Sequence, residues 1–310
     1  MILSVSRRTD IPACYPEWFI NRIREGYVMV RNPMNYHQIS RVELAPSEIE
    51  CIVFWSKNVI PFMEYLDELD KRGFLYMFQY TITPYDKLLE KNIPEKDIII
   101  KNLQELSRRI GKKRIVWRYD PILVNDYYTV GKHLNNFREM CSQLEGMVDH
   151  IIISFVDIYR KLVKSNLKKL GIDDVNDIAL NFSQIAREFG LRIKTCCEDY
   201  ELIDFGIKKG ACIDYSLIEK ICERPLKMRR AIGQRSGCLC NDSIDIGSYN
   251  TCLNGCVYCY ATERNLLSSK YALYDADSEI LCDRVDLAKD TLTRRNMKIL
   301  YKEGTNNERL

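Results

Sequence analysis

Short apolar runs alternate with longer amphipathic segments along most of the chain. The short runs are rich in β-branched and aromatic residues, which is typical of strands. Six of them predict strands: Ile2–Ser6, Cys51–Trp55, Leu75–Thr83, Arg114–Tyr119, Ile151–Val156 and Leu191–Thr195. Helical spacing of apolar residues predicts helices between them: Glu17–Glu25, Ile60–Lys71, Glu95–Ile110, Val130–Leu144 and Val175–Phe189. Repeated strand–helix units favour parallel strands, so we expect an α/β fold with a partial or complete (β/α) barrel.

Three segments depart from this alternation. Residues 26–50 are expected to form an inserted ribbon or loop, and residues 198–242 a polar, cysteine-containing insertion. The barrel core is then expected at 1–197 and 243–265. The charged region 266–310 is expected to be a helical extension with a frayed end.

Polar residues follow the apolar runs repeatedly. In parallel α/β folds the carboxyl ends of the strands share one edge of the sheet, where ligands bind. The residues expected around this edge are Arg7, Arg8, Asp10, Lys57, Asn58, Arg118, Asp120, Asp157 and Glu198. Ordinary strand-to-loop polarity with structural ion pairs is the alternative for each of them taken singly.

Composition narrows the class of protein. The chain has 310 residues, of which 46% are hydrophobic and 29% charged, and its formal net charge is +3. The near-balance of charge does not predict a nucleic-acid or membrane partner. Neither a signal segment nor a membrane-spanning apolar run is visible, so we expect a soluble, cytoplasmic protein.

Thirteen cysteines are unevenly placed, with ten of them between Cys196 and Cys282. A long chain in a reducing compartment favours metal or cluster ligation over disulfides. Cys252, Cys256 and Cys259 have the spacing C-x3-C-x2-C, which favours an iron–sulfur cluster. The alternative is zinc, bound by Cys256 and Cys259 together with Cys238 and Cys240.

The stretch "CLNGCVYC" resembles the motif of radical S-adenosylmethionine enzymes. The resemblance implies that Cys252, Cys256 and Cys259 ligate a [4Fe–4S] cluster whose fourth iron binds S-adenosylmethionine. It also implies that Tyr258 packs near the adenine, and that a reductant such as flavodoxin or ferredoxin is a partner. A second resemblance covers nearly the whole chain and rests on "SVSRRTDIPA", "FWSKN", "WRYDP", "SFVD" and "YNTCLNGCVYCYA". On these stretches the chain resembles an uncharacterised bacterial domain-of-unknown-function family that has been linked to radical enzymes by its cysteine motif.

The motif stands late in this chain, whereas in the family it lies near the amino terminus. A circular permutation reconciles the two, with residues 243–249 forming a strand beside Ile2–Ser6. The family's Gly-Gly-Glu pattern is absent, and Asp10 is the residue expected to hold the methionine amine. The other residues expected around the cofactor are Arg8, Arg118 and Asp120.

Cys196, Cys212, Cys238 and Cys240 form a second candidate set, for which an auxiliary cluster is expected ahead of structural zinc or unliganded thiols. The leading hypothesis is a radical enzyme acting on an unknown small molecule or modified macromolecule. A nucleic-acid substrate is a minority hypothesis, by analogy with the "YCY" of spore photoproduct lyase. The alternatives are a zinc-binding, non-catalytic module and an electron-transfer protein.

Overall fold

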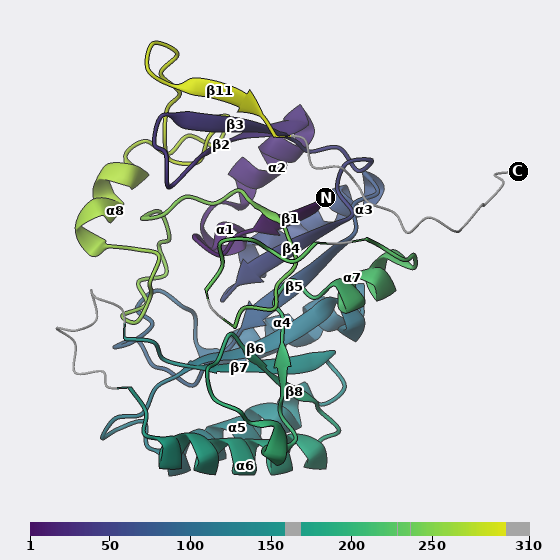
Figure 1. Cartoon of the computed structure of the whole chain (residues 1–310), viewed down its shortest axis with the longest axis vertical. Coiled ribbons are helices and arrows are strands. Elements are labelled where there is room, and N and C mark those ends of the chain that lie inside the picture. Colours follow the sequence, from purple (N-terminus) through teal and green to yellow (C-terminus); the bar gives the residue numbers. More distant parts are fainter. Residues whose placement is uncertain (159–168, 228, 236, 296–310) are drawn as a thin grey trace, which may run out of the picture.

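The computed structural model describes residues 1–158, 169–227, 229–235 and 237–295. Its largest unit is an eight-stranded sheet in which all neighbouring strands are parallel. From edge to edge the strands are β10 (Ile244–Asp245), β1 (Ile2–Val5), β4 (Cys51–Ser56), β5 (Tyr76–Thr81), β6 (Ile115–Ile122), β7 (His150–Phe155), β8 (Ile193–Cys196) and β9 (Lys208–Gly210). The predicted α/β fold with a barrel-like parallel sheet is confirmed (Figure 1).

The first strand in the sequence lies beside the last strand of this sheet. Leu3 pairs with Ile244 and Ser4 pairs with Asp245, which confirms the strand expected next to the amino-terminal one. Within the described residues β9 and β10 remain at opposite edges, so the barrel is partial. The backbone N–H of Asn241 donates to the Ile213 carbonyl (3.0 Å), which links the segment after β9 to the segment before β10.

Helices lie between the strands in sequence, as the apolar spacing predicts. Their bounds are α1 (Ile11–Cys14), α2 (Pro16–Glu25), α3 (Leu66–Lys71), α4 (Lys96–Ile110), α5 (Val130–Leu144), α6 (Ile172–Glu188), α7 (Tyr215–Cys222) and α8 (Arg264–Tyr271). The segment expected as one helix over 60–71 is a 3-10 helix (Ile60–Tyr65) followed by α3. Gly26 ends α2 in the left-handed conformation (φ 79°), which glycine adopts without the cost of a Cβ.

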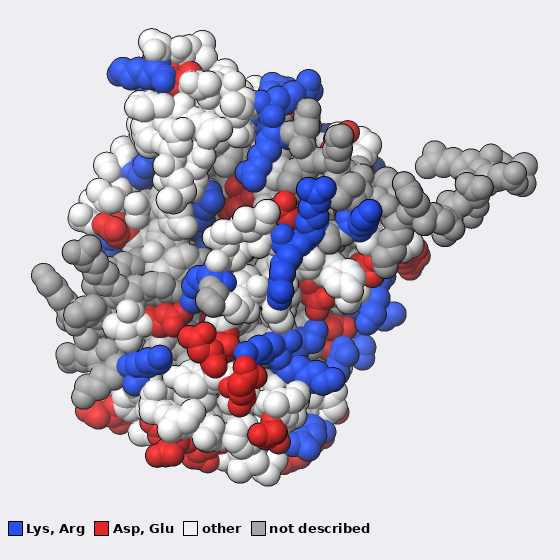
Figure 2. Space-filling model, viewed as in Figure 1, with Lys and Arg blue, Asp and Glu red and all other residues white. Residues whose placement is uncertain are grey.

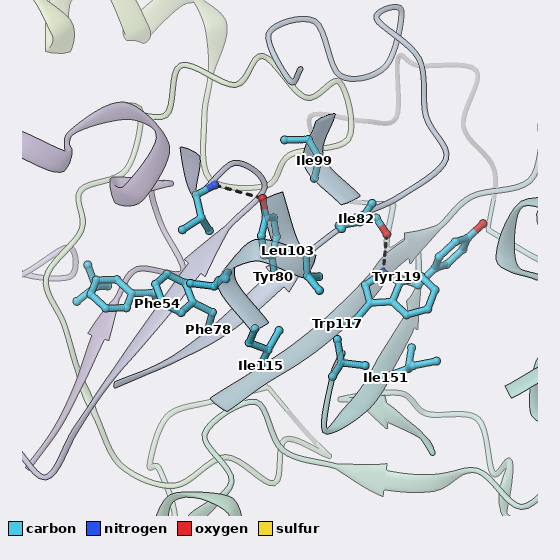
Figure 3. Close-up of a cluster of buried hydrophobic side chains, with 14 of the residues drawn as sticks. Phe54, Phe78, Tyr80, Ile82, Ile99, Leu103, Ile115, Trp117, Tyr119 and Ile151 are labelled. Atoms are coloured by element: carbon cyan, nitrogen blue, oxygen red, sulfur yellow. Dashed lines mark hydrogen bonds between the residues drawn. The ribbon is translucent and has the colours of Figure 1, made fainter. Parts of the chain in front are cut away.

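One face of the sheet is buried under α2, α4, α5 and α6. Figure 3 shows aromatic side chains of this face, with Ile99 and Leu103 from α4 beside them. The rings of Phe54 and Phe78 stack with centroids 4.8 Å apart. Residues of the same strands with the opposite parity therefore point to the other, inner face.

The inner face changes character along the strands. Its residues near the strand starts are apolar and pack against α7: Ile2, Val53, Met77, Val116 and Ile152. In four of these strands, the next residue on the inner face is polar or carries an indole. These residues are Ser4, Trp55, Gln79 and Arg118. Helix α7 therefore packs on the inner face near the starts of these strands, and polar side chains follow toward the carboxyl edge.

A second, three-stranded sheet consists of β2 (Tyr27–Arg31), β3 (Gln38–Glu43) and β11 (Thr291–Arg294). The antiparallel pair β2–β3 is the ribbon expected within residues 26–50. The helical extension expected over 266–310 is wrong for the described part after α8, because Thr291–Arg294 pairs with β3 as a strand. Arg31 holds this region by ion pairs to Asp283 (2.7 Å) and Asp290 (2.8 Å). Residues 296–310 lie outside the described residues.

No helix in the described parts of the chain is long and apolar enough to cross a membrane.

Candidate functional site

The loop that carries Cys252, Cys256 and Cys259 follows β10 at the carboxyl edge of the sheet. Segments from two other parts of the chain hold it in place. The Tyr15 hydroxyl donates to the Thr251 carbonyl (2.5 Å), and the Asn92 amide donates to the Leu253 carbonyl (2.6 Å). The loop is thus fixed from both sides, by the segment after β1 and by the segment after β5.

Asp10 links three loops rather than facing an open space. Its carboxylate accepts the backbone N–H of Ala13 (3.1 Å), the backbone N–H of Lys57 (2.7 Å) and the side-chain amide of Asn254 (2.7 Å). Burial raises the pKa of this carboxyl against these hydrogen bonds, and only 7% of the residue is exposed. The described contacts make Asp10 an anchor of the cysteine loop, through Asn254.

The three thiols of the motif are half-buried, and none of the thirteen cysteines forms a disulfide. The Cys252 thiol contacts that of Cys14, on α1, and Cys259 Sγ accepts the backbone N–H of Ala261 (3.3 Å). Burial raises the pKa of the Cys256 thiol. Three thiols on one short anchored loop are a donor set that suits a soft metal or an iron–sulfur cluster.

Within the described residues, no three or more His, Cys, Asp or Glu side chains are already arranged to hold a metal ion. Ligation by Cys252, Cys256 and Cys259 therefore requires their side chains to turn toward a common centre. Side-chain rotation on a fixed loop is a small rearrangement, because the backbone contacts of the loop are independent of the thiols.

Comparison with known proteins places the whole sheet and the cysteine loop in one family. Residues 2–261 match the family described as Domain of unknown function (DUF1848). The chain belongs to this family. The matched range ends two residues after Cys259, so the family comprises the eight-stranded sheet and the cysteine loop but not β11.

No curated protein matches the chain. Among solved structures, it is similar to a putative alpha-L-fucosidase from Bacteroides thetaiotaomicron VPI-5482, at 13% identity and a TM-score of 0.31. That similarity covers 72% of this chain and 81% of the other, and at this TM-score it carries no argument about fold or function.

A buried ion-pair cluster, made of Lys57, Glu90, Lys96 and Tyr258, lies beside the cysteine loop of this DUF1848 chain. Glu90 Oε1 accepts from Lys57 Nζ (2.8 Å) and from the Tyr258 hydroxyl, while Lys96 pairs with the other oxygen. Burial works to raise the pKa of Glu90, but the two lysines outweigh it and lower that pKa to about 2. Tyr258 is 7% exposed and its ring packs against Tyr85 (5.6 Å), so its described contacts are all within the protein core.

Arg118 and Asp120 meet within β6, on the inner face. Arg118 Nε donates to Asp120 (3.0 Å), and the Ser154 hydroxyl donates to the other oxygen of that carboxylate. Burial works to raise the pKa of Asp120, but Arg118 and Ser154 lower it. The Arg118 guanidinium also lies over the Trp55 ring at 5.5 Å. Arg118 and Asp120, both expected around the carboxyl edge, are therefore brought together.

Asp245 of β10 organises the end of β1. Its carboxylate accepts the Ser4 hydroxyl (2.9 Å), the Ser6 hydroxyl (2.5 Å) and the backbone N–H of Arg7 (2.8 Å). Arg8 donates to the Gly247 carbonyl (3.3 Å) and stands over the Tyr249 ring at 5.3 Å, against the segment that leads into the cysteine loop.

The second cysteine set is brought together from three segments: the end of β8, the residues after β9 and the approach to β10. Cys196 Sγ lies 2.7 Å from Cys212 Sγ, Cys212 contacts Cys240, and Cys240 contacts Cys238. Contact with Cys212 lowers the pKa of the Cys196 thiol. The proximity of these four thiols, expected from the sequence, is found in the structure.

The remaining residues expected at this edge, Glu198, Asp157 and Asn58, each make separate contacts rather than joining one cluster. Glu198 accepts the backbone N–H of Phe155 (2.8 Å), and burial raises the pKa of its carboxyl to about 8. Asp157 is half exposed and pairs with Arg235. Asn58 accepts the backbone N–H of Ile60 (3.2 Å) within a turn.

Two parts of the site have no counterpart in the sequence analysis. Glu90 and Lys96 lie in a loop and at a helix start, and nothing in their local pattern marks a buried ion pair. Cys14 is better explained as a neighbour of the motif than as an isolated buried thiol, because its sulfur accepts the backbone N–H of Leu253 (3.4 Å).

Proposed function

We propose that this chain is a radical S-adenosylmethionine enzyme with a circularly permuted partial barrel. The position of Cys252, Cys256 and Cys259 supports this most. Their loop directly follows β10, which pairs with β1, at the carboxyl edge where parallel α/β sheets bind ligands. The thiols are free of disulfides, and the loop is anchored independently of them.

Cys252, Cys256 and Cys259 would hold three irons of a [4Fe–4S] cluster. A cluster held by these residues would supply the single electron, taken from the reductant, for reductive cleavage of S-adenosylmethionine and so for hydrogen-atom abstraction from a substrate. Asp10 keeps the cysteine loop in position through Asn254. The buried ion pair of Lys57 and Glu90 would exclude water from one side of this loop.

The residues proposed to lie around S-adenosylmethionine are Tyr258, Asp10, Arg8, Arg118 and Asp120. Asp10 and Tyr258 are 7% exposed and bound within the protein, so they would support the cysteine loop rather than contact the cofactor. Arg8 and Asp120 are best suited to contact the cofactor, because 21% of the side chain of each is exposed. Only 7% of the Arg118 side chain is exposed. A guanidinium binds a carboxylate well, so Arg8 is assigned to the methionine carboxylate. Asp120, an acceptor held by Arg118 and Ser154, is assigned to an amine or a hydroxyl group.

The proposed partners are an unknown small molecule or modified macromolecule and a one-electron reductant such as flavodoxin or ferredoxin. A nucleic-acid substrate is not favoured. Tight binding to phosphates requires clustered basic residues. The net charge is +3, and Figure 2 shows basic and acidic side chains interspersed over the visible face.

The test is anaerobic reconstitution with iron and sulfide, followed by an assay of 5′-deoxyadenosine after addition of dithionite and S-adenosylmethionine. Wild type is compared with Cys256→Ala and with the control Cys222→Ala. Cys222 is also half-buried but lies on α7, where its thiol donates to the Glu50 carbonyl (3.3 Å). We expect cleavage in wild type and Cys222→Ala and its loss in Cys256→Ala.

Two other functions predict different results. An electron-transfer protein would bind iron and show redox-dependent colour without producing 5′-deoxyadenosine. A zinc-binding module would contain zinc, remain colourless and show no cleavage. Either result would remove the radical-enzyme proposal.

A further inference from the structure

Four thiols from distant parts of the chain converge at the open seam of the sheet. Cys196 ends β8, Cys212 follows β9, and Cys238 and Cys240 precede β10. Cys212 and Cys240 are 4% and 3% exposed, and they lie within one apolar cluster that includes residues of α7. The hydrogen bond from Asn241 to Ile213 stands directly beside them in the sequence and spans the same seam.

A buried cation faces this group. Arg118 Nη1 lies 2.9 Å from Cys212 Sγ, while the Nε and Nη2 of the same guanidinium donate to Asp120. Arg118 is 6% exposed, so its charge is balanced by protein groups rather than by water. A guanidinium nitrogen aimed at a sulfur is better satisfied by a thiolate than by a neutral thiol, because a hydrogen bond between opposite charges is stronger.

Simple apolar packing does not account for this arrangement. Small buried cysteines in a core behave as isolated hydrophobes, as Cys141 does on α5. Here four thiols form a continuous chain of sulfur contacts, with one sulfur–sulfur distance of 2.7 Å. That distance is longer than a disulfide bond of about 2.05 Å. It is shorter than the separation of about 3.7 Å between two thiolates on one tetrahedral zinc ion with bonds of about 2.3 Å.

The geometry points to a second, thiolate-bound metal centre held by Cys196, Cys212, Cys238 and Cys240. The centre would contain a thiophilic metal, either a zinc ion or an iron–sulfur cluster, and both can be bound by four cysteine thiolates. The thiols must spread from their present contacts to surround it, in keeping with the absence of a preformed metal arrangement among the described residues.

This centre would join the two edges of the sheet, because its ligands come from both sides of the seam between β9 and β10. It would also act on the inner face. Arg118 contacts Cys212 with one nitrogen and Asp120 with the others, so occupancy of the centre fixes the guanidinium and the carboxylate at the carboxyl edge.

The test uses a chain that cannot form the first site, so that the outcome does not depend on the proposed function. In the variant Cys252→Ala/Cys256→Ala/Cys259→Ala, iron, zinc and acid-labile sulfide are counted per chain after anaerobic purification. The count is repeated with Cys240→Ala added, and with Cys141→Ala added as a control at an equally buried thiol. We expect metal in the triple variant and the control, and at least a fivefold loss when Cys240 is replaced.

A second measurement does not require the variants to fold. Wild-type chain is treated with iodoacetamide before and after a strong chelator, and alkylation at each cysteine is measured by mass spectrometry. We expect Cys196, Cys212, Cys238 and Cys240 to react at least tenfold faster after chelation, and Cys141 to react at an unchanged rate.

The metal found identifies the kind of centre: about four irons with sulfide indicate a cluster, and one zinc per chain indicates a mononuclear site. Absence of metal from the triple variant, together with chelator-independent alkylation in wild type, overturns the inference. A Cys196–Cys212 disulfide found in anaerobically purified protein also overturns it. Loss of 5′-deoxyadenosine formation alone bears only on the proposed function.

Discussion

Replacement of Glu90 by glutamine tests the buried ion-pair cluster beside the cysteine loop. Glu90 is 1% exposed, and its two oxygens accept from Lys57, Lys96, Thr83 and Tyr258. Glutamine keeps the shape of the side chain but replaces one acceptor oxygen by an N–H donor. That donor faces lysine ammonium groups, so the variant loses both charge balance and hydrogen bonds.

The magnitude follows from burial. The side chains of Lys57 and Lys96 are 14% and 22% exposed, so neither ammonium can fully recover hydration where it stands. Removing one partner of a buried ion pair costs about 3–5 kcal/mol. We expect Glu90→Gln to lower the free energy of unfolding by about 3 kcal/mol, toward the lower end of that range because Lys96 is partly exposed. A buried ion pair can contribute little net stability, because removing its two charges from water is itself costly. The loss in unfolding free energy therefore measures the cost of leaving the lysines unpaired, not the net contribution of the intact pair.

The assay is urea unfolding at pH 7 followed by circular dichroism, with Glu68→Gln as the control. Glu68 pairs with Arg24 and Arg72 on the surface, where 25% of its side chain is exposed, and its loss should cost less than about 1 kcal/mol. Metal binding is measured in parallel, because the Tyr258 hydroxyl, which donates to Glu90, connects the buried ion-pair cluster to the cysteine loop. Equal losses in Glu90→Gln and Glu68→Gln would refute the reasoning from burial.

Three further variants test other parts of the structure. Asp10→Asn should lower the free energy of unfolding by about 1–3 kcal/mol, because the carboxylate that joins the loops loses an acceptor; unchanged urea unfolding would contradict its anchoring role. Gly247→Ala should destabilise, since the added Cβ would lie 2.0 Å from Ser6 Oγ, whereas Gly131→Ala meets nothing within 4 Å and should not; equal effects on thermal unfolding would argue against the tight approach of β1 and β10. Burial lowers the pKa of His133 below 6.5, so the unfolded chain binds the extra proton as the pH falls below about 6.5, and stability declines by up to about 1.4 kcal/mol per pH unit. His133→Gln should flatten this decline between pH 7 and 5, and a parallel curve for the variant would show that other groups cause it.

The alternation of strands and helices was predictable because it depends on local pattern. All six predicted strands belong to the parallel sheet, since β-branched and aromatic runs have few other ways to bury both faces. The helical extension was wrong over Thr291–Arg294 because its strand exists only by pairing with β3, some 250 residues earlier. Pairing between distant segments is not encoded in a local pattern.

The same distinction explains which site residues were predictable. Arg118 and Asp120 were found because they stand around the carboxyl end of the predicted strand Arg114–Tyr119, where position alone implies an edge of the sheet; the observed strand continues to Ile122. Glu90 was missed because its burial depends on Lys57 after β4, Lys96 at the start of α4 and Tyr258 in the cysteine loop. A charged residue in a polar loop shows no sign of burial until the segments that cover it are placed.

The two cysteine sets differ in how far their proximity can be predicted from the local sequence. Cys252, Cys256 and Cys259 lie within eight residues, so their spacing alone brings them together whatever the fold. Cys196, Cys212 and Cys240 approach one another only because β8 and β9 stand next to each other and the chain returns past Ile213 before it enters β10. Loop closure over such lengths is costly in entropy, and the cost is met by the apolar packing of α7 against the inner face. The proximity of the second set therefore depends on the sheet being formed, whereas the closeness of the first set follows from its spacing alone.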